Sequence, residues 1–334
     1  MTLTTHIAVF VFVHVAALAG TGLAFMLLSW MSLFDLPNER SSHARPIPRG
    51  AGLILTPVAA GVVGGVGLYG PNAPASAVAV AGVALALGLV SWLDDRRGLP
   101  VFLRLSAHVL AVGAALYVMR YAAPFLGGAL PPELDLAVTG FLWLWFVNLY
   151  NFMDGIDGIA GTETAIVGFG VAVVAALTGA AGGLSLIGVS FVAIATGFLW
   201  WNWPPAKIFL GDVGSIPFGF LIGWLLLLLV QQGQWAAALI LPLYYVADAT
   251  ITLARRILRR ERFWQAHRQH FYQRAAWGGM GHAGVTRAVL VAGVALILCA
   301  VVAALGWDFP ALAAAGVIVA ALLRRPSLFV GRWR

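Results

Sequence analysis

The sequence predicts an all-α polytopic membrane protein with about eleven transmembrane helices. Of its 334 residues, 61% are hydrophobic and only 10% are charged, and the mean hydropathy is +0.91. An ordinary soluble domain has roughly 25% charged residues, so this composition excludes one. Apolar segments of membrane-spanning length, about 17 to 25 residues, follow one another along the chain. No internal repeat or low-complexity linker separates them, which predicts a single integral-membrane domain over residues 1–334.

The apolar segments define the expected spans in order. They are 7–33, 51–69, 77–93, 101–120, 136–152, 159–178, 184–201, 213–230, 235–254, 285–305 and 308–323. The first lacks a preceding Lys or Arg and is longer than the apolar region of a signal peptide. We therefore expect a retained first span with the N-terminus outside. The single cysteine, Cys299, lies in an apolar run, which excludes a disulfide framework and a thiolate metal site.

The basic residues predict which ends of the spans face the cytoplasm. With the N-terminus outside, the inner segments are 34–50, 94–104, 202–212, 255–287 and the tail from 324. Every one of the 20 Lys and Arg residues except Arg120 falls in these segments, as the positive-inside rule requires. The formal charge of +7 therefore reflects topology and gives no reason to expect nucleic-acid binding. The acids of the motifs described below fall on the same side, which predicts one cytoplasmic active face.

The segment NLYNFMDGIDGIAG has the densest polar pattern in the chain. Two amides and two carboxylates recur at every third residue: Asn148, Asn151, Asp154 and Asp157. A continuous helix, at about 100° per residue, would point the first and last of these groups in opposite directions. We expect the helix to end near Phe152 and to give way to a Gly-permitted loop in which the oxygens converge. Convergent hard oxygens suit Mg²⁺ and a phosphate; a capped helix end with solvated acids is the alternative.

The third span ends in SWLDDRRGL, with two adjacent acids at the C-terminus of a helix. The helix dipole disfavours anions there by a few tenths to about 1 kcal/mol, and Arg96 and Arg97 partly offset this. Asp94 and Asp95 also repel each other. This arrangement suits a proton acceptor or a metal site, and a solvated interfacial pair is the alternative.

The seventh span ends in WWNWPPAKIFLGDVGS. Its tryptophans are typical of an interfacial aromatic belt. Asp212 lies at the start of the next span, where free backbone N–H groups favour anions, although it could be only an N-cap. Lys207, the only lysine in the chain, could neutralise a phosphate oxygen.

Two further polar features on this face each have two interpretations. The Pro- and Arg-rich connection 34–50, which contains Arg49, could cradle a lipid phosphate or could only satisfy topology. Asp248 lies late in the ninth span, and a carboxylate near the membrane interface is a functional candidate by default. Pairing with Arg255 or Arg256 would explain it structurally.

The basic segment 255–287, expected to be a cytoplasmic loop, contains AHRQHFYQR. His267 and His270 are three residues apart and could share a helix face, with Arg268 between them. Zinc would need a third ligand nearby, so we expect contacts with phosphate or sugar instead. Four further histidines have no such polar neighbours in sequence, and we expect them to be interfacial or packed: His6, His14, His108 and His282.

Four of these segments occur in the same order in a known family. From about Asp35 to Arg274 the chain resembles the polyprenyl-phosphate N-acetylhexosamine-1-phosphate transferases through PRGAG, DDRRGL, NLYNFMDGIDGIAG and FLGDVGS. This family includes the enzyme of the first membrane step of peptidoglycan synthesis and the initiators of O-antigen and teichoic acid assembly. The segment HRQHFYQR has fewer histidines than the peptidoglycan branch and looks like the branch that initiates O-antigens and capsules.

The resemblance also implies roles for residues. Asp212 matches a metal ligand and Asn151 a second one. Asp94 matches the carboxylate proposed to act on the lipid phosphate. Other catalytic or positioning acids are Asp95, Asp154 and Asp157. Expected substrate contacts come from Arg49, Asn148, Lys207, His267, Arg268 and His270.

The implied activity is transfer of a sugar 1-phosphate from a UDP-sugar to undecaprenyl phosphate. The sugar is an N-acetylated hexosamine or a 6-deoxy acetamido sugar. UMP is released, Mg²⁺ is the cofactor with Mn²⁺ as a substitute, and the site is the bacterial inner membrane. A homodimer is a further expectation. A transporter or flippase, the first alternative, would have charged groups and broken helices near mid-bilayer. A prenyltransferase-type membrane enzyme would need aspartate-rich repeats, which the sequence lacks.

Overall fold

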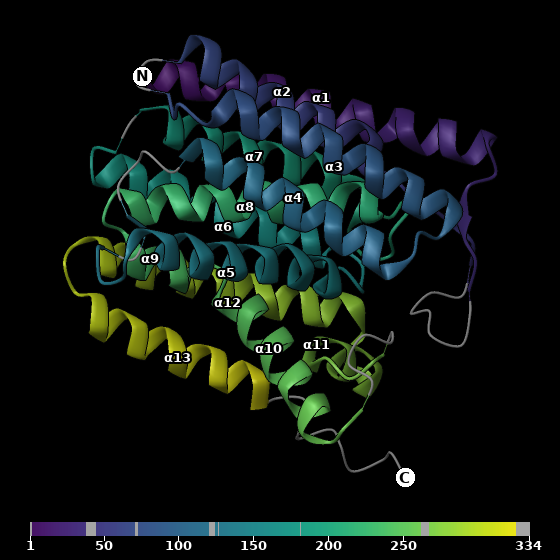
Figure 1. Ribbon diagram of the computed structural model, residues 1–334. Helices are drawn as coiled ribbons and strands as arrows, with labels where there is room; N and C mark the ends of the chain where they lie inside the picture. The colour runs from purple at the N-terminus through teal and green to yellow at the C-terminus, as the bar shows by residue number, and fades with distance from the viewer. Residues whose placement is uncertain are drawn as a thin grey trace.

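The computed structural model of the protein is a bundle of long, roughly parallel helices (Figure 1). It describes residues 2–37, 45–70, 73–119, 124–125, 127–180, 182–261 and 267–324. Within these residues nine helices are long and apolar enough to cross a membrane. The predicted fold class, an all-α polytopic membrane protein, is therefore confirmed.

The elements follow one another with short connections. The helices are α1 (Leu3–Trp30), α2 (Gly52–Tyr69), α3 (Ala77–Arg97), α4 (Val101–Met119), α5 (Pro132–Met153), α6 (Ile159–Leu177), α7 (Gly182–Asn202), α8 (Asp212–Gln231), α9 (Trp235–Ile240), α10 (Leu243–Leu258), α11 (Phe271–Ala275), the π-helical turn η1 (Ala276–Met280), α12 (Gly281–Ala304) and α13 (Asp308–Arg324). The short strands β1 (Phe34–Asp35) and β2 (Ile47–Pro48) pair in antiparallel fashion. The first eight expected spans each coincide with one helix to within a few residues.

The ninth expected span is not one helix. It breaks at Leu241 and Pro242 into α9 and α10, since proline has no N–H to donate and clashes with the preceding turn. Beyond the break α10 runs obliquely to the other helices (Figure 1). The expected loop 255–287 is also largely helical, because α10 continues to Leu258 and α12 begins at Gly281. Residues 262–266 of that loop lie outside the described part of the chain.

The helix that carries Asp212 lies at the centre of the bundle. In α8, 89% of the membrane-spanning window is buried, against 22% in α1. Helices α3 and α5 pack against α8, and its apolar side chains include the fully enclosed Trp224. The first residue of α8 is therefore held by neighbours on several sides.

Backbone contacts join the start of α2 to the start of α8. Arg49 forms a parallel bridge with Phe209, and the N–H of Gly52 donates to the Leu210 carbonyl at 3.0 Å. A Cβ on Gly52 would lie 2.2 Å from the backbone nitrogen of Gly214, so only glycine allows this approach. This contact brings the Arg49 segment beside Asp212. Residues 38–44 of the same connection, which include Arg40 and His43, lie outside the described residues.

Candidate functional site

The guanidinium of Arg49 joins two of the conspicuous acids. Its Nη2 lies 2.6 Å from Oδ1 of Asp212 and 3.2 Å from Oδ1 of Asp95. The other oxygen of Asp95 accepts the N–H of Val213 at 3.1 Å. Three segments distant in sequence, namely the connection before α2, the end of α3 and the start of α8, therefore meet at one end of the bundle. We call the side chains of Arg49, Asp95, Asp154 and Asp212 the Arg49 cluster.

Negative charge exceeds positive charge in the Arg49 cluster. Burial would lower the pKa of Arg49, but Asp212 and Asp95 outweigh this effect and the pKa is raised above its usual value. Burial raises the pKa of Asp154 to about 7; Arg49 opposes the shift, and Asp212 and Asp157 add to it. Three carboxylates thus share one guanidinium. Such an excess of buried negative charge favours the binding of a proton or a cation.

Asn151 lies beside the first turn of α8. Its Oδ1 accepts the hydroxyl of Ser215 at 2.6 Å, which fixes the amide next to the turn that begins with Asp212. Within the described residues, no three His, Cys, Asp or Glu side chains are arranged to hold a metal ion unaided. Mg²⁺ commonly takes only one or two carboxylates and completes its shell with water and substrate phosphates. One carboxylate and one oriented amide fit that requirement.

Asp94 and Asp95, although adjacent, have different partners. Asp94 is 8% exposed. Its Oδ1 accepts the N–H of Leu99 at 2.6 Å, and its Oδ2 lies 3.1 Å from Nη1 of Arg104. Each acid of the pair therefore contacts a different arginine, Asp94 contacting Arg104 and Asp95 contacting Arg49. Asp94 itself ties the end of α3 to α4 and does not join the Arg49 cluster.

The expected helix break after Phe152 is present, but the four polar groups of that segment do not all converge. Helix α5 ends at Met153, one residue beyond the expected position, and Asp154 follows as its C-cap. Asn148 instead donates to the Leu144 carbonyl of its own helix at 2.7 Å, and it pairs with His108 of α4.

Asp157 bonds to two other parts of the chain. Its Oδ2 accepts the N–H of Ala206 at 3.0 Å, and its Oδ1 lies 3.1 Å from Nδ1 of His282. The backbone carbonyl of Asp157 accepts the hydroxyl of Thr286 at 2.8 Å. These contacts hold the α5–α6 loop against the α7–α8 loop and α12. His282, predicted to be interfacial or packed, is largely covered, and its ring faces this carboxylate.

The two histidines of the basic segment stack against each other. The ring centroids of His267 and His270 are 4.8 Å apart. Burial, with His270 next, lowers the pKa of His267 to about 4, so its ring is neutral at neutral pH. It can offer a hydrogen bond there but not a positive charge. The guanidinium of Arg268 lies over the ring of Trp277, and its Nε and Nη2 are buried with no hydrogen-bond partner.

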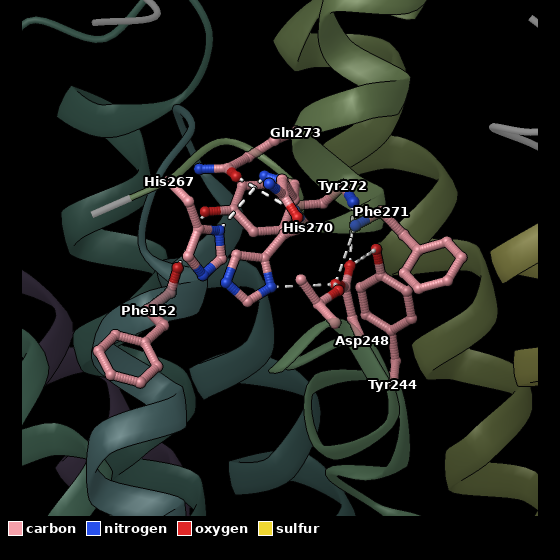
Figure 2. Close-up of polar contacts among 10 residues, drawn as sticks. Phe152, Tyr244, Asp248, His267, His270, Phe271, Tyr272 and Gln273 are labelled. Atoms are coloured by element: carbon pink, nitrogen blue, oxygen red, sulfur yellow. Dashed lines mark hydrogen bonds and ion pairs between the residues drawn. The ribbon is translucent and has the colours of Figure 1, made fainter. Parts of the chain in front are cut away.

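Asp248 does not pair with Arg255 or Arg256 as the structural interpretation expected. It is fully buried and accepts the N–H groups of Phe271 and Tyr272, each at 2.9 Å. Figure 2 shows this carboxylate at the start of α11, with His270 beside it. Asp248 is thus a helix cap supplied from another helix.

Lys207 stands apart from these contacts. It is exposed, and its ammonium lies 5.4 Å from the centroid of the Trp201 ring. Its role as a substrate contact stays a prediction.

Known proteins resemble the chain along most of its length. The sequence profile described as Glycosyl transferase family 4 matches residues 77–230. A probable undecaprenyl-phosphate N-acetylglucosaminyl 1-phosphate transferase of Bacillus subtilis (strain 168) is 30% identical over 262 residues, 74% of this chain and 71% of that protein. The chain belongs to glycosyl transferase family 4. A phospho-N-acetylmuramoyl-pentapeptide-transferase of Mycobacterium leprae (strain TN) is 29% identical over 289 residues, 72% of this chain and 79% of that protein.

The family 4 match confirms the resemblance seen in the sequence. The matched range contains three of its four segments, those with Asp94 and Asp95, with Asn151 and Asp154, and with Asp212. The Arg49 cluster and the Asn151–Ser215 contact lie where these family 4 segments meet.

Sequence reasoning missed two buried polar residues of this family 4 protein, one of which joins the loops beside the site. Asn202, at the end of α7, accepts the N–H of Gly158 at 2.9 Å and donates to the Ile208 carbonyl at 2.8 Å, and so joins the two loops. Its position just before Trp203-Pro204-Pro205, where backbone groups lose helical partners, is the signal that could have found it. Glu163 is 2% exposed in α6, and its Oε1 has no hydrogen-bond partner.

Proposed function

We propose that this family 4 protein transfers a sugar 1-phosphate from a UDP-sugar to undecaprenyl phosphate and releases UMP. An oxygen of the lipid phosphate bonds to the phosphorus that carries the sugar. The bond from that phosphorus to the oxygen bridging to UMP breaks, and UMP leaves with the electron pair. Two relatives are named as a probable undecaprenyl-phosphate N-acetylglucosaminyl 1-phosphate transferase and a phospho-N-acetylmuramoyl-pentapeptide-transferase, and these names support the reaction class.

The observation that carries the proposal is the Arg49 cluster. Asp95 and Asp212 reach the same guanidinium from α3 and α8, and the acids outnumber the cation. Mg²⁺ held by Asp212 and Asn151 would neutralise the donor's pyrophosphate and the charge that develops on UMP. Arg49 would then be free to contact a phosphate oxygen, since the metal would replace it as a partner of Asp212. Asp154, with its raised pKa, would hold or release a proton as the cation binds.

A groove in the membrane-spanning part suits the acceptor. Its volume is about 740 Å³, and it lies between α5, α8, α9 and α10 with almost entirely apolar walls. Leu149 lines it on α5, between Asn148 and Asn151 in sequence, and Val246 lines it two residues before Asp248 on α10. The groove also reaches Phe125 and Gly233, at the end of the bundle opposite to the Arg49 cluster, so a polyprenyl chain in it would have to extend beyond Leu149 to bring its phosphate to the cluster. The break at Pro242, which also lines the groove, gives it part of its wall.

The finer assignments extend the proposal. The bias of basic residues supports a cytoplasmic position for the Arg49 cluster at the bacterial inner membrane. The sparse histidine pattern HRQHFYQR favours a donor of the O-antigen or capsule type, an N-acetylated hexosamine or a 6-deoxy acetamido sugar.

The test is UMP release from the purified protein. Given undecaprenyl phosphate and Mg²⁺, the protein should release UMP with at least one of UDP-GlcNAc, UDP-GalNAc and a UDP-6-deoxy acetamido sugar, and radiolabel should appear in the lipid. Chelation with EDTA should stop the reaction, and Mg²⁺ should restore it. No UMP with any donor, together with movement of lipid or solute across vesicles, would favour the transporter instead.

A further inference from the structure

Asp248 gathers donors from two helices on one fully buried carboxylate. Besides the N–H groups of Phe271 and Tyr272, its oxygens lie 3.2 Å from Nδ1 of His270, 3.3 Å from the hydroxyl of Tyr244 and 3.4 Å from that of Thr252 (Figure 2). The contact with Asp248 occupies Nδ1 of the His270 ring and leaves Nε2 for another partner.

The same short helix reaches the loop of Asp154. The hydroxyl of Tyr272 donates to the Phe152 carbonyl at 3.0 Å, near the end of α5. A Cβ on Gly155 would lie 2.1 Å from that hydroxyl, so this glycine is needed for the close approach. A continuous set of hydrogen bonds therefore runs from Asp248 through Tyr272 to the loop that begins with Asp154.

The oblique course of α10 makes this connection important. The ninth span breaks at Pro242, so beyond that point α10 departs from the bundle direction (Figure 1). The stacked histidines, His267 and His270, belong to the segment that follows α10. Asp248 of α10 contacts His270 and so holds this segment against α10.

We propose that Asp248 is a positioning residue that sets the place of His270 and of the Asp154 loop for binding of the UDP-sugar donor. This inference rests on the proposed function. Asp248 does not touch the donor. It acts through α11, by fixing the orientation of one ring of the histidine pair and, through Tyr272, the end of α5.

The substitution Asp248→Asn tests this with little change of shape. An amide keeps one accepting oxygen but turns an N–H₂ group towards donors that the carboxylate accepted, so at least one backbone N–H of α11 loses its partner. We expect the KM for the UDP-sugar to rise by about ten-fold or more, as is typical when a group that orients a binding residue is removed. The KM for undecaprenyl phosphate should change by less than about three-fold, because the apolar groove is left intact.

Tyr244→Phe is the matched control. It removes one hydroxyl from the same carboxylate but leaves every contact with α11, so both KM values should stay within about two-fold of wild type. Tyr272→Phe removes the other end of the connection and should raise the donor KM in the same direction as Asp248→Asn. The double variant of Asp248→Asn and Tyr272→Phe should have a donor KM close to that of the more affected single variant, because both changes break one path.

Three outcomes would overturn the proposal. The first is an unchanged donor KM in Asp248→Asn. The second is a loss confined to kcat that recovers at lower temperature along with the unfolding midpoint, which would make Asp248 purely structural. The third is a double variant whose effect equals the product of the single ones. A wild-type protein without UMP release would instead reject the proposed function, so the two failures are distinguishable.

Discussion

The Arg49 cluster and Asp248 lie at the same end of the bundle, but their acids are satisfied differently. Asp95 and Asp212 share one guanidinium, and Asp154 adds a third carboxylate, whose pKa burial raises to about 7. Asp248 instead receives two backbone N–H groups and has three more polar side-chain groups within 3.4 Å. Asp157 lies between these two cases, because its Oδ2 accepts the N–H of Ala206, whereas its buried Oδ1, 3.1 Å from Nδ1 of His282, has no hydrogen-bond partner.

This difference distinguishes acids that bind a cation or substrate from acids that stabilise the fold. A buried carboxylate surrounded by donors stabilises the charged form and contributes to stability. Several carboxylates that share too few cations destabilise the fold and persist where a cation or substrate supplies the missing charge. On this basis we predict a binding role for Asp212 and a positioning role for Asp248.

The largest expected effect is on Asp212. Asp212→Asn removes a negative charge from the first turn of α8, and turnover should fall by roughly 10²- to 10³-fold or more, measured as UMP release across a Mg²⁺ titration. Asp308→Asn is the matched control, since Asp308 also begins a helix, α13. Its turnover should match that of the wild type. Wild-type turnover of Asp212→Asn at limiting Mg²⁺ would remove Asp212 from the metal site.

A smaller effect is expected at Ser215. Its hydroxyl orients the Asn151 amide, so Ser215→Ala should raise the Mg²⁺ concentration needed for half-maximal activity by about ten-fold, with little change in the maximal rate. Ser190→Ala is the control, because that buried hydroxyl bonds only the Leu186 carbonyl of its own helix. An unchanged Mg²⁺ requirement in Ser215→Ala would mean that Asn151 does not hold the ion.

The smallest effect concerns pH. Because the pKa of Asp154 is raised from 3.8 to about 7 in the folded protein, the folded state binds more protons than the unfolded state between these values. Stability without Mg²⁺ should therefore fall as pH rises from about 4 to 7 and level off above, by about 2 kcal/mol. This figure is below that of the full shift because water screens the partly exposed side chain.

The measurement is thermal unfolding in detergent with EDTA from pH 5 to 8. Asp154→Asn should flatten the pH profile and raise the unfolding midpoint at pH 8, while activity falls. A profile with the same slope in both proteins would show that Asp154 does not carry the surplus charge.

The sequence predicted the fold class and most helix positions because hydrophobicity and length define a membrane span locally. The glycines that follow each carboxylate predicted that α5 would end near Phe152. The helix ends at Met153. The α9–α10 break was missed, although Pro242 indicates it. A proline within an apolar run also occurs inside α8, at Pro217, without ending that helix, so the residue type alone does not decide.

The contacts of the candidate site were less predictable than its residues. Nothing in the adjacent pair Asp94 and Asp95 shows that one faces Arg104 and the other Arg49, because that depends on how α4 and α8 pack against α3. The partners of Asp157 and Asp248 come from distant segments, His282 and α11, that no spacing connects. The sequence indicated the acids and some of their partners, such as Arg49 and His270, but not which partner meets which acid.

The oblique helix α10 also has a consequence for the outer surface of the protein. It follows α9 after the break at Pro242, and Asp248, in its second turn, joins it to α11. Its outer side presents Ile251, Ile257 and Leu258 to the surroundings. The helix that caps α11 from within the protein therefore also presents an exposed apolar face to the surroundings.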